Sequence, residues 1–148
     1  MHRPPLRSLI AMIALPLALV ACQGSHSGGV PGDRDDHTPF SAIAENEKIR
    51  ILGTEPFWGG DVIGALLTYS TPELPAGTPV PVKRFAGRGG LSYSGELEGK
   101  ALTIAVTPGA CSDGMSDRTY PFAVTLQIGT ETRNGCGWTE RQPWAGAE

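Results

Sequence analysis

Two segments of this chain combine aromatic and charged residues closely enough to form a ligand site. The first, residues 53–59, reads GTEPFWG, and the second, residues 111–122, reads CSDGMSDRTYPF; a Gly-Cys-Gly run follows at 135–137. Glycine and proline frame both segments, which favours fixed turns over regular structure around these side chains. The candidate binding residues are the aromatic and charged side chains of the two segments: Glu55, Phe57, Trp58, Asp113, Asp117, Arg118 and Tyr120.

The first segment has a structural and a functional interpretation. Its proline fixes the chain where a strand begins, and Phe57 and Trp58 then point to opposite faces of that strand. In the structural interpretation, Trp58 plugs one end of a small barrel with Arg118 or Arg133 stacked over it. Glu55 would then pair with an arginine. In the functional interpretation, the aromatic rings form a platform for a ligand.

The second segment has three interpretations. Ser112, Asp113 and Ser116 could accept hydrogen bonds from nearby backbone N–H groups and so fix a turn. Asp113 and Asp117 could instead hold a hard cation, although the spacing lacks the ligand pattern of an EF-hand. The third interpretation is an exposed loop that recognises a partner.

The residue types argue against catalysis. The three histidines stand at positions 2, 26 and 37, so no histidine follows them to activate a serine nucleophile. Glu55 with Asp113 or Asp117 is the one carboxylate pair that could cleave a glycosidic bond, and no glycine-rich phosphate loop opens a helix. We therefore expect a protein that is not an enzyme, with no cofactor and no metal site, and keep a carboxylate-based glycan hydrolase as the outside alternative.

The first 21 residues predict export and lipidation. An apolar run at residues 9–20 follows basic residues, and at about 18 Å as a helix it is too short to cross a bilayer. It ends in Leu-Val-Ala-Cys, which matches the bacterial lipobox, so Cys22 is expected to carry the lipid anchor; an ordinary signal peptide with a chance cysteine is the alternative. Gln23 is not the aspartate that retains enterobacterial lipoproteins at the inner membrane. We therefore expect an outer-membrane protein whose domain faces the periplasm.

The remaining two cysteines predict a disulfide. Once Cys22 is lipidated, Cys111 and Cys136 have one possible pairing, and the periplasm is oxidising. Closing this loop is worth roughly 3.5 kcal/mol on the chain-entropy model. A metal-thiolate pair and a redox couple are the alternatives, but the spacing does not resemble Cys-x-x-Cys.

The two segments must be positioned by a small β domain. The chain has 148 residues, 20 Gly, 13 Pro and a formal charge of −3, which favours a turn-rich β protein and excludes a generally basic nucleic-acid binder. Residues 22–44 are expected to form the lipidated cysteine and a flexible tether, 45–138 the β domain and 139–148 a frayed tail. We expect a monomer.

Alternation of apolar and polar residues predicts about eight strands. Such short strands, spaced about ten residues apart without a helix, indicate an all-β fold: a small antiparallel β-barrel, or a sandwich. Glu98 and Gly99 mark a tight hairpin turn. The proline-rich residues 71–81 are expected to be a loop or an edge rather than central sheet. The expected strands are 48–53, 57–63, 65–70, 80–86, 91–97, 100–107, 120–128 and 131–138.

The two segments together resemble a family of bacterial envelope lipoproteins that share GTEPFW, CSDGMSDRxYP and a late Gly-Cys. The resemblance covers residues 50–138 and implies an envelope location without implying an enzymatic activity; lysozyme inhibitors on small envelope β domains offer an analogy. We expect a non-catalytic binding domain, anchored to the membrane by lipid, for an envelope protein or a small apolar or glycan ligand. A structural or stress-related envelope lipoprotein without a discrete ligand is the alternative.

Overall fold

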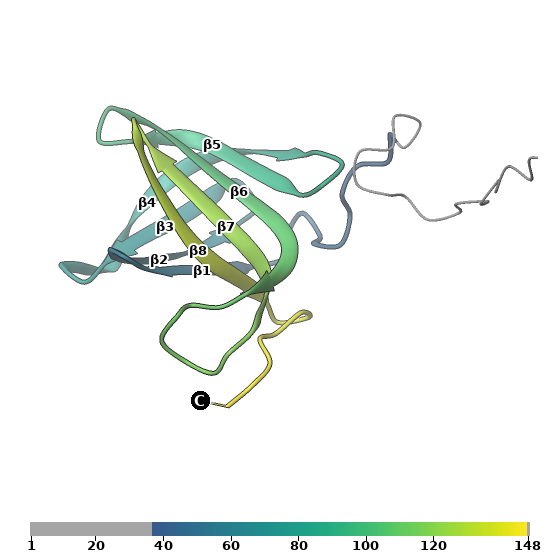
Figure 1. The fold of residues 1–148 in the computed structure, drawn as a ribbon. Coiled ribbons are helices and arrows are strands. Elements are labelled where there is room, and N and C mark those ends of the chain that lie inside the picture. Colours follow the sequence, from purple (N-terminus) through teal and green to yellow (C-terminus); the bar gives the residue numbers. More distant parts are fainter. Residues whose placement is uncertain (1–36, 148) are drawn as a thin grey trace, which may run out of the picture.

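The chain forms a closed, eight-stranded antiparallel barrel in which each strand pairs with the next and β8 pairs with β1 (Figure 1). This computed structural model describes residues 37–147; the predicted signal peptide, Cys22 and residues 23–36 of the tether lie outside the described residues. The all-β prediction is confirmed, as a barrel rather than a sandwich. The strands are β1 (Ile49–Thr54), β2 (Phe57–Ile63), β3 (Leu66–Thr71), β4 (Leu74–Ala86), β5 (Leu91–Leu97), β6 (Lys100–Cys111), β7 (Tyr120–Ile128) and β8 (Glu131–Thr139).

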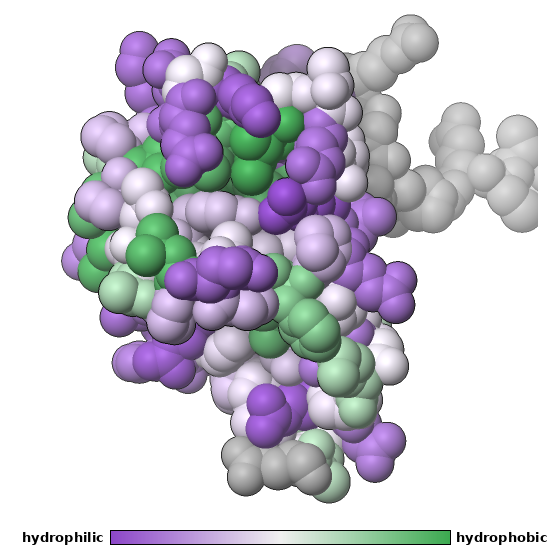
Figure 2. Space-filling view, turned by 90° about the vertical axis from the view of Figure 1, so that its left-hand side faces the viewer, coloured by the Kyte–Doolittle hydropathy of each residue, from purple (hydrophilic) through white to green (hydrophobic). Residues whose placement is uncertain are grey.

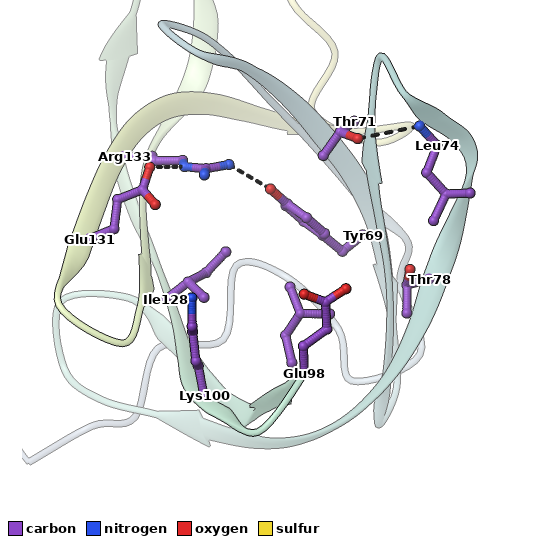
Figure 3. Close-up of a pocket in the computed structure, with 10 residues that line it drawn as sticks. Tyr69, Thr71, Leu74, Thr78, Glu98, Lys100, Ile128, Glu131 and Arg133 are labelled. Carbon is purple, nitrogen blue, oxygen red and sulfur yellow. Dashed lines mark hydrogen bonds and ion pairs between the residues drawn. The ribbon is translucent and has the colours of Figure 1, made fainter.

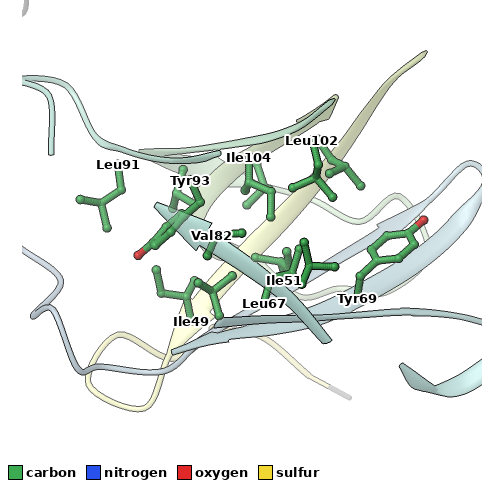
Figure 4. Packing of buried hydrophobic residues seen from close by; sticks show 14 of the residues in the cluster. Ile49, Ile51, Leu67, Tyr69, Val82, Leu91, Tyr93, Leu102 and Ile104 are labelled. Carbon is green, nitrogen blue, oxygen red and sulfur yellow. The ribbon is translucent and has the colours of Figure 1, made fainter. Parts of the chain in front are cut away.

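Alternating residues of the strands fill the barrel. In β7, Phe122, Val124 and Leu126 are buried while the residues between them are exposed, as the period of two predicts. Figure 4 shows such side chains meeting in one cluster, with Tyr69 and Tyr93 at its opposite ends and their hydroxyls turned outward. Each buried aliphatic or aromatic side chain contributes about 1.5–3 kcal/mol relative to exposure, so the barrel interior is the main source of stability.

The hairpin at residues 91–107 is confirmed. β5 and β6 pair in register, and the two turn residues Glu98 and Gly99 have φ angles of 50° and 77°. β6 extends four residues further than expected, to Cys111, after a register shift between Pro108 and Cys111. This extension carries the cysteine toward the outer face of the neighbouring strands.

The proline-rich residues 74–81 are a strand at a local edge, so of the two expectations, a loop or an edge, the edge is confirmed there. They pair with β3, whereas the pairing of β4 with β5 covers only Val82–Ala86, which makes this half of β4 locally an edge. The N–H of Val82 donates to Ala65 of the β2–β3 turn, and N–H groups alternate along a strand. The N–H groups that Pro79 and Pro81 lack would have pointed away from β3. Their absence therefore removes no hydrogen bond to β3.

The N-terminal segment closes one end of the barrel. The Phe40 N–H donates to the Gly87 carbonyl in the β4–β5 turn, and Ile43 is 1% exposed within the core cluster. The Arg84 Nη2 donates to the Ile43 carbonyl at 3.0 Å. Residues 40–43, expected to belong to the tether, are thus packed against the domain. We call this end, where Figure 1 shows the chain entering, the closed end.

The C-terminal segment is ordered against the barrel rather than frayed. Thr139 belongs to β8 and is 1% exposed. The turn that follows it is held by the Gln142 N–H, which donates to Thr139 Oγ1. Thr119 and Ala145 exchange two backbone hydrogen bonds of 2.7 and 2.9 Å. The tail therefore runs beside the loop between β6 and β7, as Figure 1 also shows.

Candidate functional site

The barrel end opposite the closed end contains an open pocket. The turns β1–β2, β3–β4, β5–β6 and β7–β8 surround this open end. The pocket has a volume of about 280 Å³ and draws residues from six strands, β3 to β8, and from the β5–β6 turn (Figure 3). We call it the mouth pocket; the residues used below are Tyr69, Leu97, Glu98, Lys100, Ile128 and Arg133.

Arg133 is the fixed centre of the mouth pocket. Its Nε donates to Glu131 Oε1 at 2.7 Å and its Nη1 donates to the Tyr69 hydroxyl at 2.6 Å. Only 17% of its side chain is exposed. The hydrogen bond to Glu131 raises the pKa of Arg133 above its already high value, and the same bond lowers the pKa of Glu131. Burial raises the pKa of Tyr69, so its hydroxyl remains protonated at neutral pH. The guanidinium is therefore a permanent cation held in one orientation.

Exposed apolar side chains surround Arg133. Phe57 is 53% exposed, Leu74 49% and Met115 68%. Each lines a hollow that also includes Arg133. Figure 2 looks at this end of the barrel and shows apolar surface recessed between charged residues. An apolar surface around a fixed arginine is typical of binding sites, where arginine and aromatic residues are enriched.

The two segments singled out in the sequence meet beside this pocket. Thr54 Oγ1 donates to the Asp113 carbonyl at 3.0 Å and joins the end of β1 to the β6–β7 loop. Between them lies a groove of about 600 Å³, which we call the outer groove; it is lined by Glu55, Phe57, residues 111–115 and residues 132–135 of β8. The structure thus brings Glu55, Phe57 and Asp113 together, and Arg133 lines both the outer groove and the mouth pocket.

The Asp113 carboxylate holds the β6–β7 loop in shape. Its Oδ1 accepts the N–H groups of Met115 and Ser116, each at 2.9 Å. Its Oδ2 accepts the hydroxyls of Ser116 at 2.8 Å and Tyr120 at 3.1 Å. Hydrogen bonds from the Met115 and Ser116 N–H groups lower the pKa of Asp113 to about 2. With the Ser112 Oγ accepting the next glycine's N–H at 3.1 Å, the turn-fixing interpretation of the second segment is confirmed.

The predicted disulfide joins Cys111 to Cys136. It fastens the end of β6 to the middle of β8, across the outer face of β7. Cys136 is 1% exposed. The bond thereby holds the β6–β7 loop over the outer groove.

Arg118 and Tyr120 pack the loop against the C-terminal segment. The Arg118 guanidinium lies 4.1 Å from the centroid of the Trp144 ring, so the prediction that it stacks on Trp58 is wrong. The Tyr120 ring, 1% exposed, lies 5.3 Å from Trp138. Asp117 is exposed in the same loop. These contacts account for both side chains as supports of the loop.

Trp58 is a core residue at the open end. It is 4% exposed and belongs to the cluster that fills the barrel. A Cβ atom at Gly53 would clash with the indole nitrogen, and one at Gly135 would lie 2.8 Å from the ring. The two glycines therefore make room for the indole. Within residues 37–147, the Trp58 Nε1 has no hydrogen-bond partner and Glu55 forms no ion pair.

The Asp113 carboxylate does not have the environment of a glycosidase general acid. A glycosidase general acid needs a raised pKa, whereas the pKa of Asp113 is lowered and both its oxygens accept hydrogen bonds. In the described part of the chain, no three His, Cys, Asp or Glu side chains gather as metal ligands.

Arg133 was expected only as a partner for Trp58, and neither Tyr69 nor Lys100 was among the candidate residues. A signal for Arg133 was present in β8. Along this strand it alternates in step with Gly135 and Gly137, so its side chain is on the inward face of the strand. A charged residue at an inward position near a strand end indicates a polar site at the mouth of a barrel.

Comparison with models of known families, with curated proteins and with solved structures gave no match for this chain. Within residues 37–147, no helix has the length and hydropathy to cross a bilayer.

Proposed function

We propose that this protein is a lipid-anchored, non-catalytic binding domain of the bacterial envelope, whose binding site is the open end of the barrel. The observation that carries the proposal is the difference between the two ends. The protein's own Ile43 fills the closed end, whereas the open end retains a pocket around the fixed cation Arg133. Eight-stranded barrels of this size can hold one small ligand.

The anchor would leave the open end free. The lipobox and the resemblance of both segments to envelope lipoproteins support lipidation at Cys22. The described chain enters the domain at the closed end, so the tether to the anchor attaches at the end opposite the mouth pocket. Mass spectrometry of the protein from its native host should show that the mature chain begins at an acylated Cys22. A retained Met1, or an unmodified Cys22, would contradict this part of the proposal.

Binding rather than catalysis fits the groups at the open end. Arg133 is engaged by Glu131 and Tyr69 and remains charged, so it can orient a ligand but cannot exchange protons near neutral pH. The apolar Phe57 and Leu74 offer contact area beside it. These features supply affinity and orientation without a nucleophile activated by a base.

A retention assay tests the binding site. The chain starting at Gln23, which keeps every described residue, is dialysed against the small-molecule pool of a bacterial envelope extract, and retained compounds are identified by mass spectrometry. The protein and an Arg141→Gln control, changed at an exposed arginine of the closed end, should retain at least one compound that Arg133→Gln does not. Identical retention by all three proteins, or none, would contradict the proposal.

A further inference from the structure

We propose that the mouth pocket recognises a small organic carboxylate with an apolar body, with Arg133 as the anion anchor. This inference rests on the proposed function and adds the chemical class of the ligand. It follows from three features of the pocket: the donor that Arg133 has left, the second cation on the rim, and the apolar floor.

Arg133 keeps one nitrogen for a ligand. Its Nε donates to Glu131 and its Nη1 donates to the Tyr69 hydroxyl, while its Nη2 has no partner among the described residues. Figure 3 shows this third nitrogen turned to the side of the pocket on which Ile128 and Lys100 lie. Because two bonds already fix the guanidinium, a ligand oxygen would meet a donor in place, and a charged hydrogen bond of this kind is stronger than a neutral one.

Lys100 provides a second positive charge. It lines the same pocket, and no carboxylate of the described residues lies within ion-pair distance of its ammonium. Glu131 pairs with Arg133 at 2.7 Å, and the charge of Lys100 also helps to lower the pKa of Glu131. Glu98 lies on the Tyr69 side of the pocket in Figure 3, away from Lys100. An anion between Arg133 and Lys100 would therefore meet two cations.

The floor and the size of the pocket limit the rest of the ligand. Tyr69 and Leu97 belong to the core cluster and Ile128 packs against it, so the three residues line the inner side of the pocket with apolar surface. A volume of about 280 Å³ accommodates about nine water-sized groups at about 30 Å³ each. A branched aliphatic acid of about this size fills the floor and places its carboxylate at the rim.

Three probes of nearly equal shape separate charge from shape: 4-methylpentanoate, 4-methylpentanamide and 4-methylpentan-1-amine, titrated by calorimetry. We expect the carboxylate to bind about tenfold or more tightly than the amide and the amine. N-acetyl-glycyl-leucine carries the same carboxylate at a peptide end; tighter binding of this probe than of 4-methylpentanoate would assign the source as a peptide C-terminus, and weaker binding as a free acid.

Variants assign the effect to the pocket. Arg133→Gln should abolish the preference for the carboxylate. Lys100→Gln changes an exposed residue at the rim, so we expect the variant to fold as the unchanged protein does. It should weaken carboxylate binding about threefold or more. Lys83→Gln, at an exposed position of β4 outside the pocket, is the matched control and should bind as the unchanged protein does.

A failure of the carboxylate assignment and a failure of the proposed function give different results. Equal or tighter binding of the amide or the amine would overturn the carboxylate assignment and leave the mouth pocket as a binding site. No binding of any probe up to about 10 mM, or unchanged binding by both Arg133→Gln and Lys100→Gln, would overturn this inference, while the retention assay decides the proposed function separately.

Discussion

The Asp113 carboxylate gives the sharpest stability prediction, because it accepts four hydrogen bonds within one loop. Asp113→Asn replaces Oδ2 by an amide nitrogen, which cannot accept from the hydroxyls of Ser116 and Tyr120. Tyr120 is 1% exposed, so its hydroxyl would lose its acceptor in a buried place. Losing such a partner costs about 1–3 kcal/mol.

The pH dependence can be worked out from the same group. The pKa of Asp113 lies at about 2 in the folded chain, against an ordinary value of 3.8. Because the folded pKa is the lower one, the unfolded chain takes up the proton first, and the stabilisation is complete above about pH 5 and is lost as the pH falls through 3.8 toward 2. The difference corresponds to at most about 2.5 kcal/mol, and we expect about 1 kcal/mol because the carboxylate is partly exposed to solvent.

Urea unfolding at pH 7, 4 and 2.5 measures both effects. We expect Asp113→Asn to lower the free energy of unfolding by about 1–2 kcal/mol at pH 7 and to lose less stability than the unchanged protein on acidification. Asp117→Asn, exposed in the same loop, is the matched control and should change stability by less than about 0.5 kcal/mol. The reasoning is refuted if Asp113→Asn is as stable as the unchanged protein at pH 7, or if the two lose the same stability between pH 4 and 2.5.

Three further predictions concern the supports of the barrel. Cys136→Ser should lower the unfolding free energy by roughly 3.5 kcal/mol in non-reducing buffer, since the cysteines are 25 residues apart; an unchanged melting temperature would contradict the role of the disulfide. Ile43→Ala should cost about 2–4 kcal/mol in urea unfolding, whereas Phe85→Ala, at a position 67% exposed, should cost less than about 0.5 kcal/mol; equal effects would show that the closed end is not plugged. Trp144→Leu removes the ring under Arg118 and should lower the free energy of urea unfolding by about 0.5–1 kcal/mol; an unchanged free energy of unfolding would contradict a stabilising role for this contact.

The barrel was predictable because its signals are local. The alternation of Phe122, Val124 and Leu126 with exposed residues sets the inward face of β7, and two adjacent residues set the turn at Glu98 and Gly99. The disulfide followed from there being only one pairing. These features depend on neighbouring residues and on composition, which the sequence displays directly.

The first half of β4 was not predictable in the same way. Proline is compatible with a strand when its missing N–H faces away from the partner strand. Whether Pro79 and Pro81 meet this condition depends on the pairing of β4 with β3 alone over this stretch. The pairing is non-local, so four prolines in eleven residues could not decide between a loop and an edge strand.

The site was predictable in part. The two segments meet because the disulfide fastens the second segment to β8, the neighbour of β1, and because Thr54 Oγ1 donates to the Asp113 carbonyl. The contact of Arg133 with Tyr69 joins residues 64 positions apart, and no local pattern contains it. Arg118 stacks on Trp144 because the C-terminal segment folds back beside the loop, a return of the chain that its composition does not indicate.

Amide chemical-shift mapping by NMR, with the compound retained from the envelope pool at saturation, tests the central proposal most directly. The account predicts the largest shifts at Tyr69, Leu97, Ile128 and Arg133 of the open end, and unchanged amides at Ile43 of the closed end. Shifts concentrated at the closed end, or spread evenly over the barrel, would contradict it.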